Sequence, residues 1–310
     1  MRDLRIAFAG TGEFAVPVLR ALAGAGRILL VITQPDRPAG RGLSPKPPPV
    51  KTAAEELGLP LIQPPSINAP EPLGRLRSLK LDLLVVAAFG QLLKRQVLQL
   101  PRLGCINVHA SLLPHYRGAA PVAWAILNGE RKTGVTIFLL DEGMDTGPIL
   151  LQEEVEIGPD ETRGELEGRL AELGGRLLLE AIDGYVAGRI RPRPQPKEGS
   201  LAPRLRKEDG EIDWSWPAER VHNWVRGMNP WPSAFTHFRG RLLKIHRTKV
   251  LEGGPAGPPG TIYAQGRRPC VLCGAGAVEL IEVQPEGKRR MSGLDFLNGW
   301  RPRPGERLGR

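Results

Sequence analysis

The sequence predicts an α/β protein made of a mostly parallel sheet with helices on both faces, followed by a small β-barrel domain. Three observations predict this fold class. Across residues 1–188, apolar runs typical of strands alternate with helical patterns, which favours a parallel sheet covered on both sides. Residues 189–205 are rich in proline and arginine and are expected to form a linker. Residues 206–310 show short alternating runs broken by glycine and proline, as in small barrels.

The chain opens with a strand, a glycine turn and a helix. Residues 4–9 are apolar, Gly10-Thr11-Gly12 forms the turn, and residues 13–23 have a helical pattern. The turn loosely matches the dinucleotide-binding fingerprint. That fingerprint also needs an acidic residue after the second strand, residues 28–33, but Pro35 disrupts the geometry needed for ribose recognition there. We therefore interpret the glycines as a tight strand-to-helix turn and keep dinucleotide binding as an alternative.

The rest of the first part alternates in the same way. Residues 81–89 form a continuous apolar run, as expected of a strand that is buried on both faces. Residues 162–187 are helical, with apolar side chains near one face. The remaining pattern predicts helices at 50–57, 69–79 and 119–128 and strands at 59–62, 103–108, 134–140 and 149–157.

The second part has one expected helix and several short strands. We expect the helix at residues 218–226 and strands at 233–238, 241–250, 260–264, 270–273 and 277–284. Trp214 and Trp231 are interpreted as packing residues rather than as platforms for base stacking. Cys270 and Cys273 form a single pair without a second pair in reach, so we interpret them as strand residues and not as zinc ligands.

The composition is that of a soluble globular protein with room for two domains. The chain has 310 residues, of which 41% are hydrophobic and 25% are charged. Its apolar runs fall short of the roughly 18 residues of a membrane helix, so we expect no membrane contact. The N-terminal residues enter a strand pattern without a secretory segment. Three cysteines cannot build a disulfide framework, which favours a location in the reducing cytoplasm.

Positive charge is concentrated in the last two-fifths of the chain. The formal net charge is +10. Residues 1–188 hold 20 Lys and Arg against 21 Asp and Glu, whereas residues 189–310 hold 23 against 12. This asymmetry predicts a catalytic part joined to a part that binds a polyanion. An arginine-rich surface without a polyanionic partner is the alternative.

Three polar side chains follow two of the expected strands. Asn107 and His109 lie two residues apart at the end of strand 103–108, so both point to one side of it. Asp145 lies in a glycine-flanked loop after strand 134–140, and the two carboxyl ends share one crevice if both strands belong to a parallel sheet. An amide that can hold an oxyanion, an imidazole that can move protons and a carboxylate suit acyl transfer. The alternative is a structural histidine that caps a strand end.

These residues stand in a longer run of motifs that resembles the folate-dependent formyltransferases. The shared motifs are Asn-x-His-x-Ser-Leu-Leu-Pro at 107–114, Tyr-Arg-Gly-Ala-Ala-Pro at 116–121, Thr-Gly-Val-Thr at 133–136 and Asp-x-Gly-x-Asp-Thr-Gly at 141–147. A second group is similar to the members of the family that act on tRNA, and it comprises residues 34–42, Ile212-Asp213-Trp214 and Asn229-Pro230-Trp231-Pro232.

The resemblance implies a Rossmann-like formyltransferase domain, an OB-like second domain and a reaction. The formyl group of 10-formyltetrahydrofolate would pass to the α-amino group of methionine on initiator tRNA, without a metal. The resemblance assigns catalysis to Asn107, His109 and Asp145, and it alone prefers Asp145 over the nearby Asp141 and Glu142. It places the folate beside the backbone at Phe89 and Gly90 and beside Ser111, Leu112, Leu113 and Pro114.

The resemblance also implies contacts with the acceptor end of tRNA. Residues 35–49 are rich in proline and cannot form a helix or a central strand, so we expect an exposed loop. The family carries a basic loop here, and Arg41 matches its arginine. Leu43-Ser44-Pro45-Lys46 stands where the family has a lysine pair, so this loop is stiffer and less charged. We expect tRNA to contact Arg41 together with Arg37, Lys46, Arg206 and Lys207.

Three other functions remain open on the residues alone. A formyltransferase that acts on glycinamide ribonucleotide or an amino sugar would use the same three residues, but it would not need the basic loop or the basic C-terminal part. An NAD-linked oxidoreductase would change the absorbance of nicotinamide. An RNA-binding module without activity is disfavoured by the intact set of polar residues. We expect a monomer that binds folate and initiator methionyl-tRNA.

Overall fold

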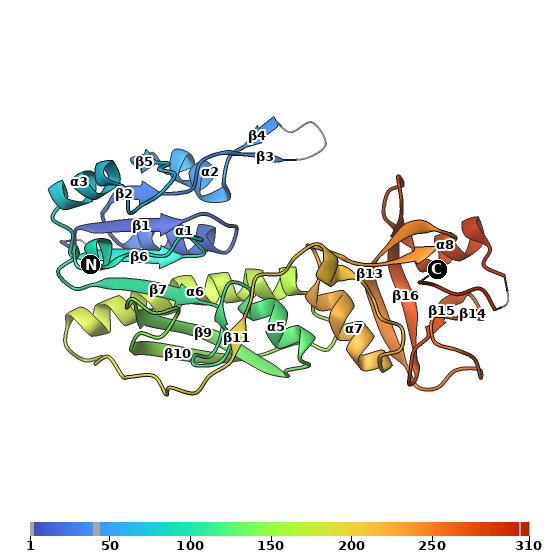
Figure 1. Cartoon of the computed structure of the whole chain (residues 1–310). Coiled ribbons are helices and arrows are strands. Elements are labelled where there is room, and N and C mark those ends of the chain that lie inside the picture. The colour runs from blue at the N-terminus through green and yellow to red at the C-terminus, as the bar shows by residue number, and fades with distance from the viewer. Residues whose placement is uncertain (1–2, 40–43, 304, 310) are drawn as a thin grey trace. The chain divides into compact units, whose positions relative to one another are not determined.

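A computed structural model of the chain describes residues 3–39, 44–303 and 305–309. They form two units (Figure 1). Unit 1 comprises Met1–Pro121, Thr133–Val155 and Glu167–Ala202, and unit 2 comprises Val122–Lys132, Glu156–Leu166 and Pro203–Arg310. Each unit is therefore assembled from segments that are separated in the sequence.

Unit 1 is built on a seven-stranded sheet in the order β10-β9-β7-β6-β1-β2-β5. Five of these strands run parallel to one another, which confirms the mostly parallel sheet: β1 (Ile6–Gly10), β2 (Ile28–Ile32), β5 (Leu61–Ile62), β6 (Leu83–Ala87) and β7 (Cys105–His109). The other two are β9 (Lys132–Leu139) and β10 (Ile149–Glu156).

The direction of β9 differs from the expectation. β9 runs antiparallel to β7, with His109 opposite Thr136, so the expected parallel pairing of these two strands is wrong. An apolar run indicates that a strand is buried but not which way it runs, because its direction depends on the path of the preceding connection. Asp145 therefore reaches the carboxyl end of β7 through the loop between β9 and β10 and not from a neighbouring parallel strand end.

The helices that pack with this sheet lie close to their expected positions. They are α1 (Ala15–Ala25), α2 (Pro49–Glu56), α3 (Pro70–Ser78) and most of α6 (Arg163–Val186), with an additional short α4 (Arg95–Leu98). Glycines allow close packing of α6, because a Cβ at Gly174 would lie 2.8 Å from Cγ1 of Val108 and one at Gly175 would lie 3.0 Å from Cβ of Ala21. Since side chains alternate along a strand, α6 supports the face of β7 opposite to Asn107 and His109.

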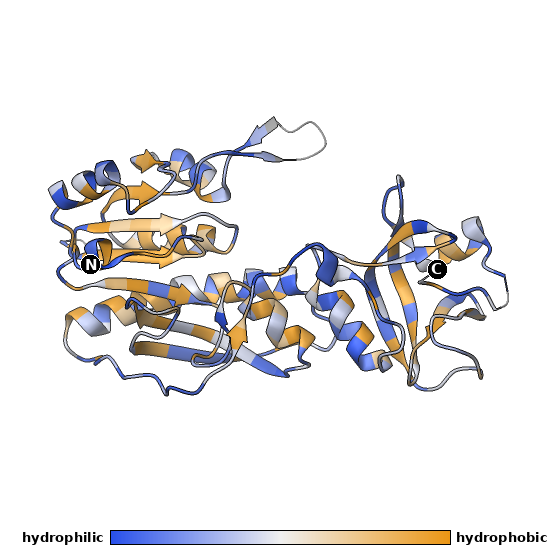
Figure 2. Ribbon diagram, viewed as in Figure 1, coloured by the Kyte–Doolittle hydropathy of each residue, from blue (hydrophilic) through white to orange (hydrophobic). Residues whose placement is uncertain are grey.

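The core of unit 1 follows the apolar runs. Every residue of β1 and β6 is buried, which confirms the expected strand at 81–89. A large apolar cluster joins these strands and β2 to α3, and the central strands are accordingly among the most hydrophobic parts in Figure 2. None of the helices in the described part of the chain is long and apolar enough to cross a membrane.

Residues 193–202, called the strap here, run along unit 1. The backbone of Arg193 forms an antiparallel bridge with Ile149 at the start of β10. Further along, β11 (Leu201–Ala202) pairs in parallel with β8 (Arg117–Gly118). Much of the segment that reads as a linker is therefore hydrogen-bonded to the unit that carries Asn107, His109 and Asp145.

Residues 35–49 contain a small hairpin that stands apart from the main sheet (Figure 1). Its strands are β3 (Arg37–Ala39) and β4 (Ser44–Lys46), and Arg37 lies opposite Lys46 in the ladder. Prolines at positions 38 and 45 lack the N–H of a central strand, which is consistent with a short, separate hairpin. Arg41 lies outside the described residues.

Unit 2 is built on an antiparallel sheet in the order β12-β13-β16-β15-β14, with β17 beside β16. The long strands confirm the expected series of strands after residue 233. The elements of this unit are α5 (Pro121–Leu127), the 3-10 turn η1 (Glu208–Gly210), α7 (Ala218–Gly227), β12 (Ala234–Phe238), β13 (Arg241–Leu251), β14 (Ile262–Gln265), β15 (Arg268–Leu272), β16 (Ala277–Pro285), β17 (Met291–Ser292) and α8 (Gly293–Trp300). α5 joins unit 2 by packing and bonding, since Trp124 donates from Nε1 to the carbonyl of Pro203 at 2.8 Å.

Four unit 2 side chains can be compared with their expected roles. Trp214 is a core residue, as expected, and its Nε1 donates to Oγ1 of Thr236 at 3.0 Å. Trp231 is 51% exposed and is therefore not a core residue, so its interpretation as a packing residue stays a prediction. Cys270 and Cys273 are buried at β15, and burial raises the pKa of the Cys273 thiol to about 12. Both cysteines thus behave as apolar strand residues.

Candidate active site

β7 presents two polar side chains at its carboxyl end. Asn107 and His109 point to one face of the sheet, while Val108 between them packs against α6. Both are largely buried, with 9% of Asn107 and 6% of His109 exposed. No hydrogen bond among the described residues uses the side-chain amide of Asn107. Its N–H groups thus remain available for an acceptor, such as an oxygen that gains charge during acyl transfer.

His109 is held in one orientation from two sides. Its Nε2 lies 3.0 Å from the carbonyl oxygen of Tyr116. A carbonyl oxygen can only accept, so Nε2 carries the proton and Nδ1 of the neutral ring has the free lone pair. Phe138 of β9 packs edge-on against the ring, with centroids 6.4 Å apart. The atom of His109 that can exchange a proton is therefore Nδ1.

Asp145 lies beside Nδ1 of His109. Its Oδ2 is 3.8 Å from that nitrogen, which is longer than a hydrogen bond and short enough for an ion pair when the ring is protonated. The same Oδ2 accepts a hydrogen bond of 2.8 Å from the backbone N–H of Gly118. Asp145 has φ = 55°, in the left-handed region that residues other than glycine seldom adopt. The carboxylate is thus held by backbone on one side and faces the imidazole on the other.

The three acidic residues of this loop have different partners. Asp141 accepts hydrogen bonds from Oγ1 of Thr146 at 2.8 Å and from the backbone N–H of Gly143 at 3.0 Å, so it stabilises the turn itself. Glu142 is exposed and pairs with Arg95 at 3.7 Å. Of the three, Asp145 is the carboxylate beside the imidazole.

A tightly bonded loop brings the Tyr116 carbonyl to His109. Ser111 donates from Oγ to the carbonyl of His115 at 2.6 Å, and Thr136 donates from Oγ1 to the carbonyl of Ser111 at 2.6 Å. Tyr116 itself has φ = 61°. The position of the carbonyl therefore depends on the conformation of the whole loop and not on the tyrosine side chain.

The residues expected to line the folate site divide into two groups. Ser111 is fully buried and its hydroxyl is bonded within the loop, and Leu113 is 3% exposed, so both support the loop. Leu112 and Pro114 are partly exposed and can be reached by a ligand. The expectation that residues 111–114 line the folate site thus stays a prediction, and sequence reasoning did not distinguish supporting side chains from accessible ones.

The turn after β6 is fastened to the ends of neighbouring strands. The carbonyl of Phe89 accepts hydrogen bonds from Oγ1 of Thr11 at 3.0 Å and from Nε2 of Gln34 at 2.8 Å. Gly90 has φ = 77°, and a Cβ there would lie 2.7 Å from Nε2 of Gln34, so the turn requires glycine. Ala88 and Gly90 are exposed. Their backbone is thus accessible at the carboxyl edge of the parallel strands, where open α/β sheets bind ligands.

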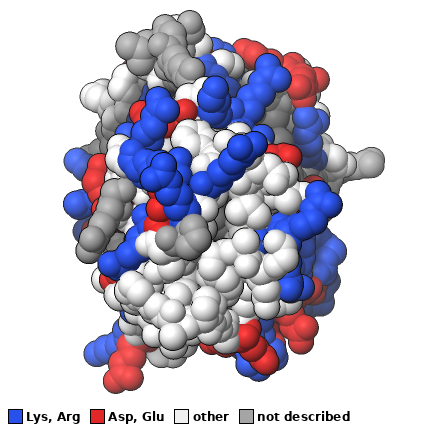
Figure 3. All heavy atoms as spheres, turned by 90° about the vertical axis from the view of Figure 1, so that its right-hand side faces the viewer, with Lys and Arg blue, Asp and Glu red and all other residues white. Residues whose placement is uncertain are grey.

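The basic residues expected to contact tRNA lie on both units. Arg37 and Lys46 are exposed on the β3–β4 hairpin, and Arg37 donates from Nη2 to Oε1 of Gln34 at 2.5 Å. Arg206 and Lys207 are exposed in unit 2. On the face of the molecule drawn in Figure 3, many Lys and Arg side chains lie in the upper half, and the centre of the lower half is uncharged.

Some cations of unit 2 are already paired. Arg239 forms a bidentate ion pair with Glu306, with N–O distances of 2.9 and 2.8 Å, and its guanidinium lies 4.7 Å from the ring centroid of Phe238. Arg247 pairs with Glu165 at 2.5 Å. These two arginines therefore add less to a field that attracts phosphates than exposed residues such as Arg206 do.

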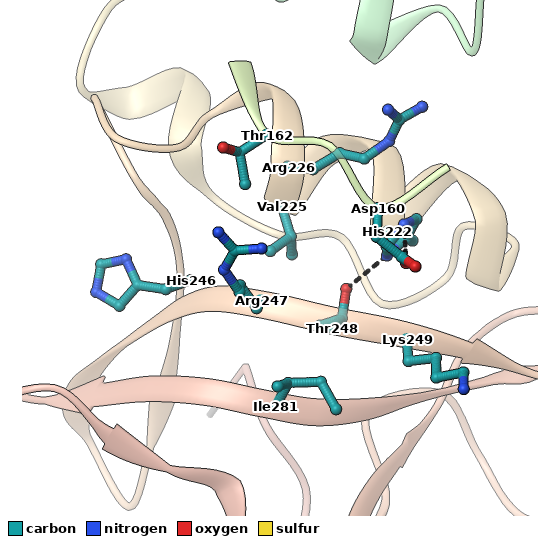
Figure 4. Close-up of a pocket in the computed structure, with 10 residues that line it drawn as sticks. All are labelled: Asp160, Thr162, His222, Val225, Arg226, His246, Arg247, Thr248, Lys249 and Ile281. Carbon is teal, nitrogen blue, oxygen red and sulfur yellow. Dashed lines mark hydrogen bonds and ion pairs between the residues drawn. The ribbon is translucent and has the colours of Figure 1, made fainter. Parts of the chain in front are cut away.

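Unit 2 also contains a hollow of about 200 Å³ between α7, β13 and the segment before α6 (Figure 4). Several of its polar groups are already bonded: Nδ1 of His222 lies 3.0 Å from Oγ1 of Thr248, Arg226 donates to backbone carbonyls, and Arg247 pairs with Glu165 outside the lining. Burial lowers the pKa of His222, which favours the neutral ring. We therefore do not assign chemistry to this hollow, which is lined by Asp160, Thr162, His222, Val225, Arg226, His246, Arg247, Thr248, Lys249 and Ile281.

Two groups at the site were missed by sequence reasoning. One is the backbone carbonyl of Tyr116, for which a sequence offers no signal because any residue has a carbonyl. The other is Gln195 in the strap, whose side chain reaches the Asp145 loop. It lies between two prolines in the segment interpreted as a linker. Within the described residues, no cluster of His, Cys, Asp and Glu is arranged to hold a metal ion.

Comparisons with known proteins agree over the whole chain. Residues 4–182 match the Formyl transferase family, and residues 204–301 match the Formyl transferase, C-terminal domain family. The methionyl-tRNA formyltransferase of Citrifermentans bemidjiense is 47% identical over 313 aligned residues, which cover 100% of this chain and 98% of the relative. The methionyl-tRNA formyltransferase of Geobacter sulfurreducens is 46% identical over 312, with the same coverage.

A solved structure supports the fold. The N-formyltransferase from Helicobacter canadensis, in complex with folinic acid and dTDP-3-aminofucose, is similar with a TM-score of 0.67. The likeness covers 91% of this chain and 99% of that chain, at 17% identity. At this identity the likeness concerns the fold alone.

Proposed function

The chain belongs to the formyl transferase family, and we infer that it transfers the formyl group of 10-formyltetrahydrofolate to the α-amino group of initiator methionyl-tRNA. The observation that carries this conclusion is identity of 46–47% over the full chain to relatives of that name. The product, N-formylmethionyl-tRNA, serves translation initiation. The amino-sugar alternative shares the fold at 17% identity, which gives no support for its acceptor.

We propose that Asn107 stabilises the charge that develops on the formyl oxygen. Its amide lies at the carboxyl end of β7 and is not engaged by other described groups. A neutral donor can face a developing oxyanion without the cost of burying a cation. The folate supplies the activated formyl group on N10 when it is bound. The exposed backbone at Ala88 and Gly90 fits the polar edge of the flat folate ring, and the partly exposed Leu112 offers apolar surface to it.

We assign proton transfer to His109 and Asp145. The amine of an aminoacyl group has a reference pKa of roughly 7.7–8, so part of it is neutral near pH 7 and needs little activation. Once it attacks, it must lose a proton, and the departing N10 must gain one. Nδ1 of the neutral His109 ring can accept a proton and, once protonated, can donate it to the departing N10, and the carboxylate 3.8 Å away stabilises the protonated ring. Asp145 also accepts the proton of the amine, through water.

The exposed cations are proposed to bind the tRNA. Arg37, Arg41 and Lys46 belong to the hairpin segment, and Arg206 and Lys207 belong to unit 2. Support comes from the concentration of positive charge after residue 188 and from the exposure of the described members of the set. We further propose a division into a catalytic part, residues 1–188, and a tRNA-binding part, residues 206–310. The protein is proposed to act as a monomer in the cytoplasm, where its three free thiols are stable.

The decisive experiment is the transfer of a labelled formyl group from 10-formyltetrahydrofolate to charged initiator tRNA. Uncharged tRNA and free methionine are the acceptor controls, and elongator methionyl-tRNA tests the choice of tRNA. Label in the methionyl group of the initiator alone supports the function. Equal labelling of free methionine or of an amino sugar would overturn the assignment of the acceptor.

A further inference from the structure

Gln195 connects the strap to the loop that carries Asp145. Its side-chain Nε2 donates to the carbonyl of Asp145 at 2.9 Å and to the carbonyl of Gly147 at 2.7 Å. One amide group thus uses both of its N–H donors on two carbonyls that flank Thr146. These bonds fix the backbone on the C-terminal side of Asp145, where φ = 55° is otherwise unfavourable.

The other end of the same amide is held by Arg117. Its Nη2 and Nε lie 2.9 and 3.3 Å from Oε1 of Gln195, and its guanidinium also donates to the carbonyls of Pro196 and Lys197. The guanidinium therefore fixes the strap and orients the amide, so that the N–H groups of Gln195 point to the Asp145 loop. Hydrogen bonds to a charged donor are the stronger kind.

These contacts close a ring around Asp145. Gly118, the next residue after Arg117, donates its backbone N–H to Oδ2 of Asp145 at 2.8 Å. Asp145 is consequently bound through its carboxylate by Gly118 and through its carbonyl by Gln195, and Arg117 joins the two. Neither bond alone would set both the position and the direction of the carboxylate.

The sequence of the strap explains why a side chain does this work. Gln195 lies between Pro194 and Pro196, which have no backbone N–H to donate. Within residues 194–196 only Gln195 has a backbone N–H, so the backbone at this point cannot supply donors to two carbonyls. The glutamine supplies two donors and one acceptor from a single planar group, and the flanking prolines restrict the backbone that carries it.

We propose that Gln195 is a positioning residue, which holds the Asp145 carboxylate beside Nδ1 of His109 for proton transfer. The proposal rests on the catalytic assignment of Asp145 made above. It predicts that changes at Gln195 act on turnover and not on the binding of either substrate, because both ends of the side-chain amide are bonded within the protein.

The first test replaces the donors and keeps the shape. Gln195→Glu has nearly the same volume and retains an acceptor for Arg117, but it has no N–H for the carbonyls of Asp145 and Gly147. We expect kcat to fall about 10- to 100-fold, as for a catalytic group displaced by a fraction of an ångström to an ångström. The KM values for 10-formyltetrahydrofolate and methionyl-tRNA should change less than about threefold. Glu198→Gln, an exposed change in the same strap, is the matched control and should keep wild-type kcat.

The second test asks whether Gln195 acts through Asp145. In a double-mutant cycle, Gln195→Glu should lower kcat by less than about threefold when Asp145 is already Asn, because there is no longer a base to position. An equal loss in both backgrounds, or a loss confined to KM, would overturn the proposal. If Gln195→Glu lowers the thermal midpoint strongly, the cycle is repeated with Arg117→Lys, which weakens the hold on Oε1 and retains a cation. A loss of kcat for that variant that persists in full beside Asp145→Asn also overturns it.

The outcomes separate this proposal from the catalytic assignment. Wild-type turnover of Asp145→Asn alone would remove Asp145 from the mechanism, and the proposal with it. A large loss for Asp145→Asn together with wild-type turnover of Gln195→Glu would leave the catalytic assignment intact and remove Gln195 only.

Discussion

The proposed catalytic edge of unit 1 and the basic surface of unit 2, which comprises Arg204, Arg206 and Lys207 and is proposed to bind tRNA, are built in opposite ways. At the edge, His109 and Asp145 are each held by backbone groups at fixed distances, and both are largely buried. On unit 2, the cations are carried by long, exposed side chains such as Arg206 and Lys207. Catalysis needs groups that are already placed, whereas attraction of a polyanion needs many charges and little geometry. Substitutions in the two regions should therefore change different quantities.

The largest effect is expected at the catalytic edge. His109→Ala and Asn107→Ala should each lower kcat by about 10²–10⁴, because they remove a proton-transfer group and an oxyanion donor. Affinity for tRNA should stay within about twofold, since neither side chain belongs to the basic surface. Single-turnover formyl transfer and tRNA binding would be measured on the same preparations. Near wild-type turnover of either variant would remove that residue from the mechanism.

The second effect should appear in affinity and not in turnover. Arg204, Arg206 and Lys207, all exposed, would be replaced together by Gln. Each lost phosphate contact should reduce the slope of log affinity against log salt by roughly 0.7–0.9, so the triple variant should lose about 2 to 3. The kcat at saturating tRNA should not change.

A matched variant sharpens this comparison. Arg239 and Arg247 lie in the same unit, but Glu306 and Glu165 already compensate their charges. Replacement of these two arginines by Gln should therefore change the salt slope much less per residue than the triple variant does. Equal changes per residue would mean that net charge alone, and not accessible charge, determines tRNA affinity.

A smaller effect is expected from the hairpin segment. Arg41→Ala should lower kcat/KM for initiator tRNA by roughly tenfold, more than loss of one charge explains, because a contact at the acceptor end also places the amine. Lys46→Ala is a better control than Arg37→Ala, since Arg37 is bonded to Gln34, which in turn holds the Phe89 carbonyl. Equal effects of Arg41→Ala and Lys46→Ala would indicate that the segment contributes charge only.

The smallest effect concerns stability and pH. The hydrogen bond from the backbone N–H of Thr162 is the largest cause that lowers the pKa of Glu165 from 4.5 to about 2, followed by hydrogen bonds from Arg247 and from the Thr162 side chain. A carboxyl whose pKa is lower in the folded state stabilises it above pH 4.5, and this stabilisation is lost as the pH falls from 4.5 to about 2. Because both side chains are about half exposed, we expect only about 0.5–1 kcal/mol.

The variant Glu165→Gln isolates this contribution. It keeps the side-chain shape that caps the start of α6 and removes the charge. The difference in unfolding free energy between wild type and variant should be largest near pH 7 and should vanish near pH 2. Urea titrations at pH 7, 4 and 2.5 would measure it, and a difference that does not depend on pH would exclude the ion pair as its source.

Most of the fold could be predicted because apolar runs record burial directly. The run at 81–89 became β6, and the helical pattern at 162–187 became α6. The direction of a strand and the presence of small helices were harder to predict from the sequence. The antiparallel course of β9 is set by the connection before it, and α8 was missed although Ser292, whose Oγ accepts from the N–H of Asp295, is a recognisable N-cap.

Only part of the candidate site could be predicted from the sequence. The spacing of Asn107 and His109 placed both on one face of a strand, which needs only the period of two. Asp145 was selected by family resemblance, and the structure supplies a physical reason, because Asp141 and Glu142 have other partners. The Tyr116 carbonyl and Gln195 depend on contacts between segments that are distant in the chain, and no local pattern encodes such contacts.

The interleaved course of the chain limits how this protein can be divided. The chain passes between the two units five times, and segments 122–132 and 156–166 belong to unit 2 although they lie far upstream of its main segment, residues 203–310. Trp124, for example, is bonded to Pro203. If residues 203–310 were replaced by those of a relative, segments 122–132 and 156–166 of this chain would therefore pack against side chains to which they are not matched. Substitutions in 122–132 and 156–166 should thus be inherited together with those in 203–310, and chimeras that respect only the apparent linker should fold poorly.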